Sequence, residues 1–184
     1  MPRFPFAPVA ACAMLLPSLA AAQAQALAPT QPTAPPSPAD AMAPLDAATY
    51  LAKAAAGDRF EIESSRLILA KSPSAKVASF ARMMIADHTH STARLTQAAR
   101  QDGLAMPAPA LDSTQAAALD GLRQAQGETA QNVYLAAQRD AHTAALALHR
   151  AYADKGDKPA LRAAANAIAP VVARHADMLA QLGG

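Results

Sequence analysis

The sequence has no tryptophan, 4% aromatic residues and one cysteine among 184 residues. A β-sandwich core needs more large side chains than this, whereas abundant alanine suits helices that pack through small side chains. The sequence also lacks an excess of charge of one sign, because its 16 basic and 14 acidic residues nearly balance. The basic residues do not cluster. The composition therefore predicts an all-α protein and gives no reason to expect a nucleic acid as partner.

The first 22 residues have the features of a cleavable secretory signal peptide. Arg3 supplies a positive charge, an apolar stretch covers residues 8–19, and small residues precede Gln23 as a cleavage site. We therefore expect a periplasmic or secreted protein. A lipid anchor on Cys12 is the less favoured alternative, because most of the apolar stretch follows that residue. Cleavage near Gln23 removes the only cysteine, which excludes disulfides and thiolate metal ligands.

Residues 23–44 are rich in proline, alanine, glutamine, threonine and serine. Such a segment cannot bury enough apolar surface to offset the entropy lost on ordering, so we expect a disordered linker. Residues 45–184 then form the one folded domain. No later stretch has the roughly 20 uninterrupted apolar residues that a membrane-spanning helix needs.

Deleting residues 23–44 should leave the free energy of unfolding nearly unchanged. The reason is that this segment lacks the apolar periodicity that would let it pack on a folded domain. Thermal melts of the mature chain with and without the segment test the prediction. A loss above about 1 kcal/mol, larger than typical surface effects, would show instead that the linker packs on the domain.

Capping residues and apolar spacing divide the folded region into helices. Asp46 is expected to cap the first helix, Ser72 to cap the second with Pro73 at its first position, and Pro170 to kink the last. The expected helices cover about 47–71, 73–102, 113–127, 128–155 and 159–182. Four are long and have apolar residues spaced near 3.5. Two helical hairpins joined by a crossover with a short extra helix, an antiparallel four-helix bundle, is the expected arrangement.

Three histidines lie on the expected inward faces. His88 and His175 fall on the apolar stripes of the second and last helices, and His142 lies at the edge of the stripe on the fourth. His90 and His149 fit solvent-facing or boundary positions better. Each inward histidine alone is explained by a hydrogen bond to a core neighbour. Together they predict a site for a divalent metal ion or a pH-sensitive core.

Glu61 on the first helix could add a carboxylate to the same interior. It lies one helical turn after Asp58 and one turn before Ser65. The alternative is a surface charge that interacts with Arg59 or Arg66. Glu61 is therefore a hypothetical fourth metal ligand.

The residues at 60–67, 77–88, 140–142 and 170–175 resemble a bacterial exported family known as domain of unknown function 4142. The resemblance covers about residues 47–182 and includes a Met-x-x-Asp-His element that ends at His88. It implies a ferritin-like bundle and a location in the cell envelope. It implies no activity, since none is established for the family.

A di-iron centre of the ferritin kind does not fit this sequence. Such a centre needs a glutamate three residues before a histidine on two helices, and here those positions hold Ile85, Arg139 and Val172. The offsets of Asp87 and Asp140 from the next histidine direct their side chains away from that histidine's face. No nucleophile or phosphate-binding motif is present in the sequence either.

Three functions remain open at this point. The sequence favours a non-enzymatic envelope protein that acts through its surface, with a protein partner or a second copy of itself. The alternative is a bundle that binds zinc, copper or iron for sequestration or sensing. A redox or hydrolytic enzyme at the same site is the third and weakest alternative.

Overall fold

The computed structural model describes residues 45–182, and every regular element within them is an α-helix. The helices are α1 (Ala47–Leu69), α2 (Ala75–Gln101), α3 (Ser113–Gln124), α4 (Gly127–Lys155) and α5 (Pro159–Leu182). The all-α prediction is thus confirmed for this region. None of these helices is long and apolar enough to cross a membrane. The expected signal peptide and linker lie outside the described residues.

The helix ends show which capping predictions were right. The Asp46 side chain accepts a hydrogen bond from the backbone N–H of Thr49 at 2.9 Å, as an N-cap does. The prediction that Ser72 caps α2 is wrong, because Ser74 does so. Ser72 lies in the turn between α1 and α2 and has a left-handed backbone with φ of 52°, whereas an N-cap residue needs an extended one.

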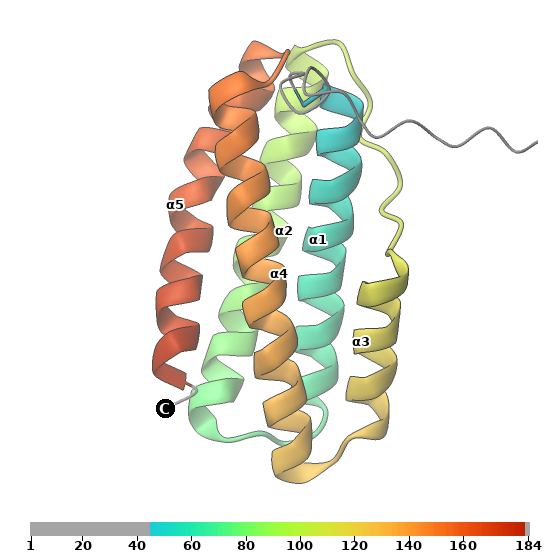
Figure 1. Ribbon diagram of the computed structural model, residues 1–184, viewed down its shortest axis with the longest axis vertical. Coiled ribbons are helices and arrows are strands. Elements are labelled where there is room, and N and C mark those ends of the chain that lie inside the picture. The colour runs from blue at the N-terminus through green and yellow to red at the C-terminus, as the bar shows by residue number, and fades with distance from the viewer. Residues whose placement is uncertain (1–44, 183–184) are drawn as a thin grey trace, which may run out of the picture. The chain divides into compact units, whose positions relative to one another are not determined.

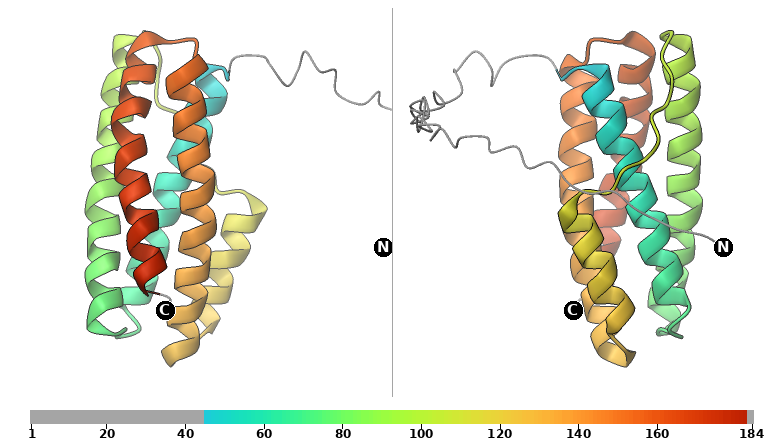
Figure 2. Two further views of the ribbon diagram at one scale, coloured as in Figure 1. Left: turned by 60° about the vertical axis from the view of Figure 1, so that its left-hand side comes forward. Right: turned by 90° about the vertical axis from the view of Figure 1, so that its right-hand side faces the viewer.

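Two helical hairpins, α1 with α2 and α4 with α5, lie side by side (Figure 1). α2 contacts α5, α1 contacts α4, and neighbouring long helices run in opposite directions (Figures 1 and 2). The connection between the hairpins carries α3, which packs on the outside of both α1 and α4. α5 continues through Pro170, and the kink predicted there stays a prediction.

The buried residues form two apolar clusters with a polar layer between them. One cluster includes Tyr50, Leu51, Leu95, Tyr152, Leu161 and Ile168, and the other includes Ile68, Phe80, Met84, Tyr134 and Leu179. Each long helix contributes to both clusters and carries buried polar residues between its two contributions. Burying polar groups is costly unless they are paired, so this layer is the part of the core that packing alone does not explain.

The two histidines expected at the surface or boundary differ. His90 is exposed, as predicted. The prediction for His149 is wrong, because its residue is only 4% exposed and its Nδ1 lies 3.0 Å from the hydroxyl of Tyr50. Tyr50 lies on α1 and provides the partner that lets an imidazole enter the core next to the stacked ring of Tyr152.

Candidate metal centre

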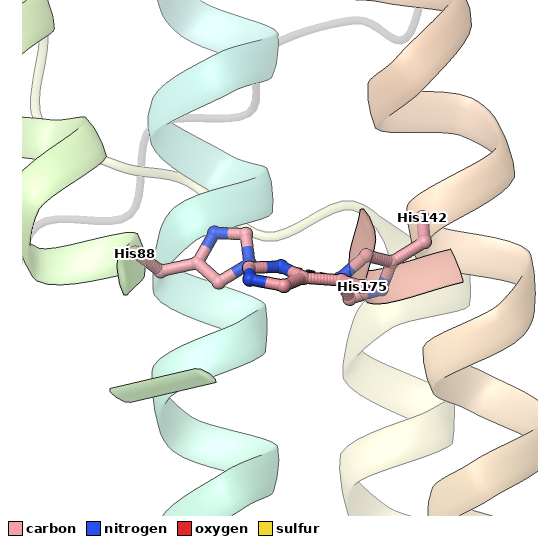
Figure 3. Close-up of side chains that lie close together, drawn as sticks. All are labelled: His88, His142 and His175. Atoms are coloured by element: carbon pink, nitrogen blue, oxygen red, sulfur yellow. Dashed lines mark hydrogen bonds between the residues drawn. The ribbon is translucent and has the colours of Figure 1, made fainter. Parts of the chain in front are cut away.

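His88, His142 and His175 converge in the polar layer (Figure 3). They come from α2, α4 and α5, so three of the four long helices each supply one imidazole. One ring nitrogen of each lies within 4.8 Å of the others. The residues are 5%, 1% and 1% exposed, respectively. The structure therefore brings three side chains that can ligate a metal to one buried point.

A hydrogen-bond acceptor binds the outward nitrogen of each of these rings. His88 Nδ1 lies 2.8 Å from the Asp58 carboxylate, and His175 Nε2 lies 2.8 Å from the Asp87 carboxylate. His142 Nδ1 lies 2.8 Å from the backbone carbonyl of Gln138, one turn earlier on α4. Carbonyl and carboxylate oxygens only accept, so each outward nitrogen must carry the ring proton.

When all three rings are neutral, these tautomers leave a lone pair on each inward nitrogen. His88 Nε2 is buried and has no hydrogen-bond partner. His142 Nε2 and His175 Nδ1 are 3.3 Å apart, and neither neutral ring has a proton to place between them. Three lone pairs that face one another repel unless a cation lies among them. Histidine metal ligands are oriented in the same way, with the other ring nitrogen bound to an outer acceptor.

Burial keeps two of the rings neutral, which is the form that binds a metal. It lowers the pKa of His142 to about 3, and it also lowers the pKa of His175. Burial opposes the charging of His88 as well, but the hydrogen bond to Asp58 and the nearby carboxylates outweigh it and raise its pKa. His88 is therefore the ring on which a proton competes most directly with a metal.

Glu61 lies beside this group but on its outer side. The residue is 2% exposed, so the alternative of a surface charge is wrong. Its Oε1 is 3.5 Å from Nδ1 of His142, the nitrogen that points outward, and its Oε2 is buried without a hydrogen-bond partner. Burial raises its pKa to about 7. Glu61 is not in the set of residues whose ligand atoms lie within 4.8 Å of one another, and its role as a ligand stays a prediction.

Asp58 and Asp87 are site residues that the sequence did not point to. Asp58 is buried and also accepts a hydrogen bond from the hydroxyl of Thr92 at 2.9 Å. It lies three residues before Glu61, and that helical spacing could have placed it on the same face. The position of Asp87 on its helix predicts a side chain that points away from the neighbouring His88. Its partner is His175 on another helix, which no local spacing reveals.

The family model described as "Domain of unknown function (DUF4142)" matches residues 31–182. The chain belongs to this family. No curated protein and no solved structure matches the chain. The DUF4142 match includes α1 to α5 and so all three histidines, together with Asp58 and Asp87. The DUF4142 description carries no activity, so the residues of the site are the indication of function that remains.

Proposed function

We propose that this protein is an exported metal-binding bundle in which His88, His142 and His175 hold one divalent transition-metal ion. The observation that carries the proposal is the orientation of the three rings. Each outward nitrogen donates to a fixed acceptor, and the inward nitrogen of each ring, when that ring is neutral, offers a lone pair to the same buried point. We further propose that the four long helices form a ferritin-like bundle, as the resemblance implies.

The charges around the rings favour a cation. The carboxylates of Asp58 and Asp87 bind two of the rings directly, and the carboxyl group of Glu61, whose pKa burial raises to about 7, adds a partial negative charge next to the third. Negative charge next to a neutral imidazole ring strengthens the binding of a positive ion by that ring. Imidazole ligands suit zinc, copper, iron and nickel, whereas magnesium and calcium prefer oxygen ligands. Zinc and copper are therefore the ions to test first.

Burial favours storage or sensing of the ion over catalysis. None of the three histidines is more than 5% exposed, so an organic substrate has no access to an ion held among them. Sequestration or sensing in the envelope needs only the ion to enter and leave. The sequence alone favoured a role through the surface, and the three convergent lone pairs are the reason for preferring metal binding.

Protein purified without a His-tag from the periplasm should contain close to one equivalent of a transition metal per chain. Elemental analysis of the native protein measures its metal content. Dialysis against a chelator should remove the metal, and addition of zinc should then restore one equivalent per chain. The matched control is the His175→Ala protein, purified in the same way. Metal content in the wild type no higher than in that variant, both as purified and after zinc is added, would contradict the proposal.

A further inference from the structure

A metal ion held by these histidines has to pass between helices to reach them. The two helices within each hairpin contact each other more extensively than helices of different hairpins do, and the two hairpins meet along two looser seams, α1 with α4 and α2 with α5. α3 packs on both α1 and α4 and covers the lower part of the first seam, and the connection that leads to α3 crosses α1 above it (Figure 2). No segment among residues 45–182 lies over the α2–α5 seam in these views.

Asp87 lies on the uncovered seam and reaches solvent. It is on α2, and its carboxylate binds His175 on α5, so the contact crosses from one hairpin to the other. The Asp87 side chain is 28% exposed. The other two carboxylates next to the rings, those of Asp58 and Glu61, are 5% and 3% exposed. Asp87 therefore combines contact with a ligand histidine and contact with water.

We infer that the metal ion enters through the α2–α5 seam and that the Asp87 carboxylate captures it from solvent. This inference rests on the proposed metal site. Asp87 attracts the hydrated cation, which then moves to the three inward nitrogens beyond the ring of His175. Asp58 has a different role, because it is buried and only orients His88. Loss of the Asp87 charge should slow metal entry, whereas loss of the Asp58 charge should weaken retention.

The variant that tests this is Asp87→Asn. The asparagine side-chain oxygen can still accept a hydrogen bond from Nε2–H of His175, but the negative charge is gone. Stopped-flow mixing of metal-free protein with zinc and a chromophoric zinc indicator gives the association and dissociation rates. In Asp87→Asn, we expect the association rate to fall about tenfold and to depend less on salt, since a charge that steers a dication is lost. Asp87→Glu should restore both.

Two matched variants separate this effect from others. Asp58→Asn should keep the association rate and lose about 10- to 100-fold in affinity through faster dissociation, as outer partners of histidine ligands do. Asp177→Asn removes an exposed charge from α5 near His175 and should behave as wild type. An unchanged association rate in Asp87→Asn, or an equal slowing in Asp58→Asn, would overturn the entry route and leave the metal site standing. A wild-type protein that takes up no zinc would overturn both.

Discussion

Zinc or copper at about 100 times its dissociation constant should raise the free energy of unfolding of the metal-free protein by roughly 2.7 kcal/mol. The reason is that the unfolded chain does not hold the three inward nitrogens together, so the ion binds the folded form preferentially. The ion also relieves the contact between two lone pairs, those of His142 Nε2 and His175 Nδ1, 3.3 Å apart. Thermal melts with and without metal measure the effect.

Single alanine variants show whether the stabilisation comes from this site. His88→Ala, His142→Ala and His175→Ala should each abolish the metal-induced shift, even though each also lowers the stability of the metal-free protein by leaving a cavity. The matched control is His90→Ala, which removes an exposed imidazole from the same helix as His88. Equal shifts in the His88 and His90 variants would mean that the ion binds elsewhere on the surface.

The helices were predictable because local chemistry determines them. Asp46 and Asp112 have the side chains that cap a helix, and the apolar spacing between such caps repeats with the helical period. The inward position of His88 and His175 followed from the same period, since each lies on the apolar stripe of its helix. These features depend on a few neighbouring residues, so a single sequence contains them.

The partners of the histidines were not predictable, because they depend on how one helix is rotated and shifted against another. Asp87 is next to His88 in sequence but bonds to His175, 88 residues away. The helix position of His149 predicts a boundary residue, because it gives no sign of Tyr50, which lies 99 residues away. Side chains beside the apolar stripe of one helix meet partners on other helices, and only the packed structure identifies those partners.

His149 should make the metal-free protein less stable in mild acid. Burial lowers its pKa from 6.5 to about 4 in the folded state. Below pH 6.5 the unfolded chain therefore binds a proton that the folded protein does not. Protonation of His149 costs the folded protein no stability above pH 6.5, and stability is lost as the pH falls from 6.5 to about 4. At about 1.4 kcal/mol per pKa unit, the loss is roughly 3 kcal/mol.

The variant His149→Gln isolates the effect of His149 protonation on stability. Glutamine does not titrate, and its side-chain oxygen can accept a hydrogen bond from the Tyr50 hydroxyl. Denaturant unfolding at pH 4 to 7 with a chelator present gives both stability curves. Glu61, whose pKa burial raises to about 7, has the opposite effect, since its protonated form favours folding as the pH falls. It is present in both proteins and cancels in their difference, as does His142.

The wild type should therefore lose stability relative to His149→Gln across this range, and His90→Gln should follow the wild type. Parallel curves for wild type and His149→Gln would mean that His149 accepts a proton in the folded protein as readily as in the unfolded chain.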